Sequence, residues 1–178
     1  MTCIPAAIEN IPARGLVSQP GQAPVFAIID SRVEVLASNA HTGGRAFIII
    51  ETSQPGGGPP LHKHTNEDEF FYILESTYKF LIDGKEFVVA AGSSLLAPAG
   101  TSHTFANMGP GIGRLLIATF PCNVSNPSTF ERAFQQTDEV CLRGEFSPDT
   151  IAAIFEPAGV KFLGPPLAAV GLIPNHAH

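Results

Sequence analysis

Cysteines, basic residues and long apolar runs are all scarce in this sequence, and each scarcity excludes a class of protein. The three cysteines, Cys3, Cys122 and Cys141, are an odd number and show no CxxC spacing. Neither a disulfide framework nor a zinc ribbon is therefore expected, and the thiols are interpreted as buried or incidental. No stretch of about eighteen apolar residues occurs, so no membrane span is predicted.

Positive charge is also in short supply. Ten Lys and Arg stand against sixteen Asp and Glu, which gives a formal net charge of −6. Nucleic-acid binding needs a basic surface that releases counterions, and no Lys/Arg cluster provides one here. Residues 1–15 lack the cationic stretch and apolar block of a secretory signal, so a cytoplasmic location is expected.

Glycine and proline, by contrast, are abundant and divide the chain into short, β-prone segments. Seventeen glycines and sixteen prolines punctuate 178 residues, a length typical of one domain. Asp83-Gly84 is a dipeptide favoured in two-residue hairpin turns. Strands are predicted at residues 33–37, 45–52, 69–82, 85–91, 94–97, 102–107 and 114–120. This pattern predicts an all-β sandwich or closed barrel.

The composition changes towards helix after residue 121. Ser128 and Glu131 have the spacing of a capping box, which predicts a first helix. Ser147 is suited to cap a second helix, with Pro148 at its first position. These two helices are expected to pack on the outside of the barrel.

Histidines and one glutamate form the group that points to chemistry. His62 and His64 lie two residues apart, so a strand would place both side chains on one face. Glu69 begins the next β-prone stretch, and His103 would be the fourth member. Imidazoles with one carboxylate suit a divalent transition ion, and four protein ligands leave open positions for a substrate.

The spacing of these residues resembles the two sequence motifs of the cupins. The first, G(X)5HXH(X)3-4E(X)6G, is matched by Gly56, His62, His64 and Glu69, with Ser76 at the closing glycine. The second, G(X)5PXG(X)2H(X)3N, is matched in full by Gly92, Pro98, Gly100, His103 and Asn107. The resemblance covers residues 56–107. The Ser76 departure concerns a turn and not a ligand.

The resemblance implies a single cupin domain over residues 1–178. Its fold would be a double-stranded β-helix, or jelly-roll barrel, at about residues 24–121. A helical extension would follow at about residues 125–158. Cupins commonly pair, so a homodimer is expected. The implied cofactor is one divalent ion, Fe, Ni, Mn, Cu, Co or Zn, held by His62, His64, Glu69 and His103.

Within the cupins the chain is most similar to single-domain quercetinase-like proteins, which share an ending like GVKFLGPPL at residues 159–167. The similarity implies a dioxygenase in which the metal binds an enol or phenolate oxygen. Glu69 would serve as ligand and as the base that removes the substrate proton. Dioxygen would then attack the activated carbon of a small organic substrate.

Three alternatives remain open at this level. The same ligands suit a non-redox isomerase, cyclase, lyase or decarboxylase, in which the ion is a Lewis acid. The protein could also be a non-catalytic small-molecule-binding cupin. In a metal-free barrel the histidines would simply be core residues.

Residues near the predicted ligands have weaker claims. Counting by twos along the strands places Phe71, Ile73 and Phe105 inside the barrel, where they could line a substrate pocket or simply fill the core. Asn107 is expected to tie down backbone at the end of its strand. Glu67 and Asp68 are interpreted as solvated neighbours of the ligand Glu69.

Overall fold

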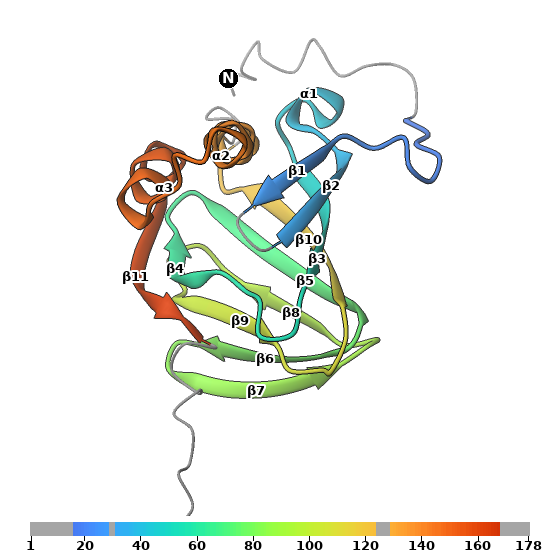
Figure 1. The fold of residues 1–178 in the computed structure, drawn as a ribbon, viewed down its shortest axis with the longest axis vertical. Coiled ribbons are helices and arrows are strands. Elements are labelled where there is room, and N and C mark those ends of the chain that lie inside the picture. Colours follow the sequence, from blue (N-terminus) through green and yellow to red (C-terminus); the bar gives the residue numbers. More distant parts are fainter. Residues whose placement is uncertain (1–15, 29–30, 124–128, 168–178) are drawn as a thin grey trace, which may run out of the picture.

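Two antiparallel sheets packed face to face make up most of the molecule (Figure 1). The computed structural model describes residues 16–28, 31–123 and 129–167. The strands are β1 Val25–Ile28, β2 Ser31–Ala37, β3 Phe47–Ser53, β4 Pro60–His64, β5 Glu67–Glu75, β6 Thr77–Ile82, β7 Lys85–Ala90, β8 Ser94–Ala97, β9 His103–Asn107, β10 Gly113–Pro121 and β11 Val160–Pro166. The helices are α1 Asn39–Thr42, α2 Phe130–Arg143 and α3 Pro148–Phe155, with a 3₁₀ turn, η2, at Glu156–Ala158.

The strand order is that of a jelly roll. One sheet runs β1-β2-β3-β10-β5-β8 and the other β11-β4-β9-β6-β7. Strands that are consecutive along the chain therefore often lie in opposite sheets, as β4 and β5 do. The predicted all-β jelly-roll fold with short helices is confirmed.

The hairpin between β6 and β7 turns as its dipeptide predicts. Ile82 pairs with Lys85, which leaves Asp83 and Gly84 as the two turn residues. Both have positive φ, 45° and 76°, the conformation that Asp-Gly favours in two-residue hairpins.

The long stretch expected at residues 69–82 is in fact two strands that belong to different sheets. The break is at Ser76, whose φ of 80° is left-handed. Its Oγ donates to Asn107 Oδ1 at 2.7 Å, while Asn107 Nδ2 donates to the carbonyl oxygens of Ser53 and Gly111. The departure from glycine in the first motif is thus compensated by a hydrogen bond, and Asn107 ties down backbone as predicted.

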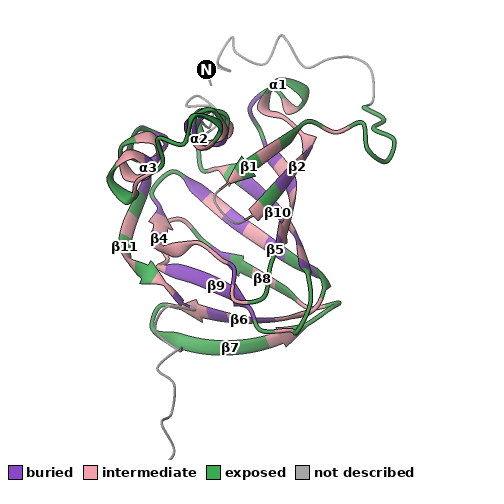
Figure 2. Cartoon of the chain, in the orientation of Figure 1, coloured by how far each residue is buried: buried purple, intermediate pink, exposed green. Residues whose placement is uncertain are grey.

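The core lies between the two sheets, where the inward-facing residues are almost completely buried, as the purple stretches of the strands in Figure 2 indicate. Phe71 and Ile73 on β5, Phe80 and Tyr78 on β6 and Phe105 on β9 are central members. Tyr78 shares a 2.9 Å hydrogen bond with Ser53 Oγ, so its hydroxyl is satisfied within the apolar core.

Helices α2 and α3 lie outside the strands, at one end of the barrel (Figure 1). Ser147 caps α3 as predicted, because its Oγ accepts from the Thr150 N–H at 3.1 Å. The cap of α2 is Thr129, and Ser128 lies outside the described residues. Asp138 of α2 accepts from the Ala27 N–H at 2.7 Å, which fastens the helix to β1. Across the described ranges, no helix combines the length and apolarity that a bilayer crossing requires.

Candidate metal centre

Three strands from both sheets deliver the predicted ligands to one place. His62 and His64 point inward from β4, and His103 lies directly opposite His62 on the neighbouring β9. Glu69 reaches the same point from β5 in the facing sheet. One ligand atom from each of the four lies within 4.8 Å of all the others, and all four residues are buried. The structure therefore brings together the group that the sequence proposed.

The carboxylate of Glu69 is at the middle of this group. Its Oε2 is 2.8 Å from His103 Nε2 and 3.2 Å from His64 Nε2. The His62 and His103 rings are 4.4 Å apart, and the rings of His64 and His103 are nearly parallel at 5.6 Å. Nitrogen and oxygen donors thus converge from different directions, as ion ligation requires.

The outer nitrogens of the imidazoles are engaged from behind. His62 Nδ1 is 2.8 Å from the Pro60 carbonyl oxygen and His103 Nδ1 is 3.0 Å from that of Thr101. A carbonyl oxygen can only accept, so these two Nδ1 atoms carry hydrogen, and it is the Nε2 atom of each ring that would bind a metal once it carries no proton. Such outer contacts fix ring orientation in metal sites.

The ionisable groups are strongly perturbed by burial and by one another. Burial, with contributions from His103 and His64, lowers the pKa of His62 to about 3. Burial also acts to lower the pKa of His64, but the carboxylates of Glu69 and Glu67 outweigh it and raise the value to about 9. Against the effect of burial, His64 and His103 hold the pKa of Glu69 well below its usual range. At neutral pH His64 is therefore protonated beside an ionised Glu69.

This donor set fits a divalent transition ion. Three imidazoles and a carboxylate match the preferences of such ions, and among the described residues the Nε2 atom of His64 has an ion-pair contact with Glu69 but no hydrogen bond. An ion there would take the place of the proton on His64. An octahedral ion with four protein ligands would keep two positions for other molecules.

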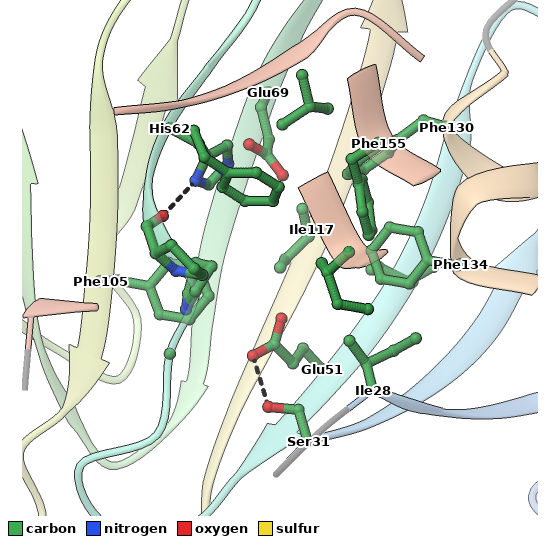
Figure 3. A pocket seen from close by; sticks show the side chains of 17 residues that line it. Ile28, Ser31, Glu51, His62, Glu69, Phe105, Ile117, Phe130, Phe134 and Phe155 are labelled. Carbon is green, nitrogen blue, oxygen red and sulfur yellow. Dashed lines mark hydrogen bonds between the residues drawn. The ribbon is translucent and has the colours of Figure 1, made fainter. Parts of the chain in front are cut away.

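A cavity of about 90 Å³ opens beside the group (Figure 3). His62 and Glu69 line it, and Ser31 Oγ donates to Glu51 at 3.1 Å at the opposite end. Most of the remaining wall is apolar, from the strands and from both helices; its aromatic members are Phe105, Phe130, Phe134, Phe155 and Phe162. A molecule in the cavity would approach the ligands from the side of His62 and Glu69.

The predicted pocket residues are divided between cavity and core. Phe105 lines the cavity. Phe71 and Ile73 are fully buried and are absent from the cavity wall that the structure describes. Phe71 packs instead against Phe80 and against the His103 ring, with centroids 5.2 and 5.8 Å apart. Phe71 lies two residues further along β5 than Glu69, so its side chain is on the same face of the strand. From there it packs against the ring of the candidate ligand His103.

Helices α2 and α3 lie outside the barrel as expected, but they also contribute side chains to the candidate site. Phe130 packs edge-on against the His64 ring at 4.8 Å, and Phe134 and Phe155 complete an aromatic cluster around it. Phe130 and Phe134 are about one turn apart and are both buried, so they belong to the apolar face of α2. Which surface that face covers depends on the tertiary structure.

Sequence reasoning missed a second buried carboxylate. Glu67, expected to be solvated, is only 2% exposed, and its Oε2 is 3.4 Å from His64 Nδ1. Asp68 is half-buried and accepts from the Ala99 N–H at 2.8 Å. Strand alternation was the available signal, because residues 67 and 69 must share a face.

The remaining histidines lie away from the centre or outside the described residues. The His41 ring accepts a hydrogen bond from Ser38 N in the capping box of α1, a structural role. His176 and His178 lie outside the described residues. Of the thiols that the structure describes, Cys122 is exposed and Cys141 is half-buried, and both are free.

Comparison with known proteins gives a family match over the barrel. Residues 40–119 match the family Cupin_2, described as a cupin domain. This range contains all four candidate ligands.

Curated relatives are more distant and differ in what their names state. The chain is 38% identical over 69 residues to an oxalate-binding protein of Thermotoga maritima, which covers 39% of this chain and 56% of that protein. It is 28% identical over 71 residues to quercetin 2,3-dioxygenase of Bacillus subtilis, which covers 40% of this chain and 21% of that enzyme. The alignments thus span about half of one relative and a fifth of the other.

Solved structures support the fold. A predicted oxalate decarboxylase from Thermotoga maritima superposes with a TM-score of 0.56 at 23% identity. The match covers 60% of this chain and 99% of that structure.

Proposed function

We propose that this protein, whose residues 40–119 match a cupin family and whose strands form a jelly roll, is a metal-dependent enzyme with quercetinase-like dioxygenase chemistry. Its substrate would be a small organic molecule that is largely apolar or aromatic and carries an enol or phenol hydroxyl. The ion would be bound by His62, His64, Glu69 and His103.

One observation carries the proposal: the ligand group opens onto an apolar cavity. His62 and Glu69 form one end of a wall that is otherwise dominated by phenylalanine and aliphatic side chains (Figure 3). Pockets of this kind bind apolar molecules and orient them through a few polar groups. Here those polar groups are the ligand group at one end and Ser31 with Glu51 at the other.

The residues have distinct roles in this scheme. A bound divalent ion would supply charge stabilisation for the developing enolate or phenolate oxygen. Glu69, which its low pKa keeps ionised, would be the carboxylate that accepts the hydroxyl proton. Phe105 and the helix phenyl groups would hold the substrate and exclude water. Both atoms of dioxygen would enter the substrate.

The cavity wall favours a larger and less polar substrate than oxalate, the ligand named for one relative. A bound ion could hold a small dianion by itself, but such a dianion would leave the apolar wall without a contact. Neither lysine nor arginine lines the cavity within the described ranges, and phenylalanine and aliphatic side chains dominate it. An apolar or aromatic substrate therefore matches the wall better.

Elemental analysis, followed by oxygen uptake, tests the proposal. The protein, loaded with Fe, Ni, Mn, Cu or Co in turn, is mixed with flavonols and other enolisable aromatic compounds in an oxygen electrode. We expect a stoichiometry of one dioxygen per substrate with at least one ion and no turnover without oxygen. Turnover under anaerobic conditions with Zn would instead establish a non-redox reaction. Metal-free protein that no metal stabilises would indicate a binding protein.

A matched pair of variants tests the role of Glu69. Glu69→Gln is expected to keep some metal and to lose turnover, because the amide cannot accept the substrate proton. Glu75→Gln makes the same change at an exposed position of the same strand and should behave as wild type. If Glu69→Gln retained wild-type turnover, another residue would have to be the base.

A further inference from the structure

Glu67, the first residue of β5, is a buried carboxylate that the proposed reaction does not use. It is 2% exposed, and neither of its side-chain oxygens has a hydrogen-bond partner among the residues that the structure describes. Burying a carboxylate without a hydrogen bond is unfavourable, so such a group needs an explanation. Glu67 forms an ion pair with the imidazole of His64, whose Nδ1 lies 3.4 Å from Glu67 Oε2.

Strand alternation places Glu67 and Glu69 around a single histidine. Both side chains project from the same face of β5, opposite Pro121 and Thr119 of β10. Glu69 approaches the Nε2 side of His64 at 3.2 Å, and Glu67 approaches the Nδ1 side. The imidazole is therefore bracketed by two carboxylates that lie two residues apart.

His64 differs in this respect from the other two histidines. The Nδ1 atoms of His62 and His103 lie against backbone carbonyl oxygens, which are neutral acceptors. Only His64 among the three has a carboxylate behind it. A carboxylate behind a ligating imidazole fixes its orientation and increases its basicity.

The charge of a bound ion gives a second reason for a carboxylate at position 67. A divalent ion held by three neutral imidazoles and Glu69 would leave one uncompensated positive charge within the buried group. Uncompensated charge is unfavourable inside a protein. Glu67 would supply the second negative charge within reach of the same ligand.

From this geometry we propose that Glu67 is a positioning residue for the metal ion, acting through His64. It accepts a hydrogen bond from His64 Nδ1–H when the ion is bound to Nε2, and it balances the second charge of the ion. This inference rests on the proposed metal site and adds to it a residue that raises affinity without touching the ion.

Titration of the metal-free protein with Co²⁺ tests the inference, because absorption of bound Co²⁺ reports both affinity and ligand geometry. Glu67→Gln keeps the size of the side chain and an acceptor oxygen but removes the charge. We expect its affinity for Co²⁺ to fall by about 10- to 100-fold, with an altered spectrum. Its melting temperature without metal is measured in parallel, because a purely structural role of Glu67 would change that quantity alone. Glu75→Gln is the matched control and should leave both quantities unchanged.

Two further variants separate positioning from simple packing. Glu67→Ala should bind Co²⁺ more weakly than wild type, and Glu67→Asp, which retains the carboxylate, should recover part of the difference. If the variants lower only the melting temperature of the metal-free protein and bind Co²⁺ as wild type does, Glu67 is structural and the inference is overturned. Wild-type protein that binds no Co²⁺ would instead overturn the metal site, and the inference with it.

Discussion

The two ends of the barrel interior are equally buried but opposite in chemistry. On β5 the inward-facing residues are Glu67 and Glu69 at one end and Phe71 and Ile73 at the other. On β9 the same change takes place within two residues, from the candidate ligand His103 to the hydrophobic Phe105. Burial by itself therefore does not distinguish site from core. The apolar end stabilises the fold, whereas the polar end retains costly buried groups that a metal would satisfy.

The largest expected effect belongs to the apolar end. Phe80 is fully buried, and its ring lies 5.2 to 5.3 Å from those of Phe71 and Phe105. Phe80→Ala should lower the free energy of unfolding by about 3–5 kcal/mol, because it leaves a cavity in the packed core. Urea denaturation measures this loss. The folded fraction should still bind metal, and loss of binding there would show that the two ends are not separable.

Substitution of a candidate ligand at the polar end should weaken metal binding and leave the fold largely intact, the opposite of what is expected for Phe80→Ala. His103→Ala is expected to weaken metal binding by more than about 100-fold, beyond the range found when only an outer partner of a ligand is removed. The fold should persist, since the apolar end is untouched. Metal content after dialysis and circular dichroism check both expectations. His41→Ala, remote from the centre, is the control, and full metal occupancy in His103→Ala would refute the ligand assignment.

The polar end alone should respond to pH. His64, with a pKa of about 9, is protonated below that value, and its proton must leave before a metal can bind. Between pH 7 and 9, affinity should therefore rise by roughly tenfold per pH unit. Calorimetry in buffers of different ionisation enthalpy should detect about one proton released at pH 7.5. An affinity that is flat across this range would contradict the raised pKa.

The smallest effect is expected at Ser76, where the chain passes from one sheet to the other. Ser76→Ala keeps the left-handed φ of 80° but loses the bond to Asn107, and should cost about 1 kcal/mol of unfolding free energy. Ser76→Gly loses the same bond but relieves the backbone strain, so its net effect should be close to zero. Urea denaturation compares the two. An alanine variant as stable as wild type would show that the hydrogen bond contributes nothing.

Local patterns predicted the candidate ligand group and the turn at Asp83-Gly84. The four candidate ligands could be proposed because side-chain alternation is a property of a short segment and their spacing resembled known motifs. The same alternation applied backwards from Glu69 would have identified Glu67 as inward-facing. The break between β5 and β6 was missed because Ser76 stands where the motif has a glycine. A serine, unlike a glycine, does not indicate that a strand ends.

Strand periodicity and turn residues were enough to predict an all-β sandwich or barrel, and the resemblance to the two cupin motifs added the jelly roll and the set of candidate ligands. The enclosure of the cavity by Phe130, Phe134 and Phe155, and the pairing of β11 with β4, depend on the tertiary structure. It also decided that Glu67 is buried behind His64. Each of these results depends on which distant element covers a given face, and that is settled by packing over the whole chain and not by any local pattern.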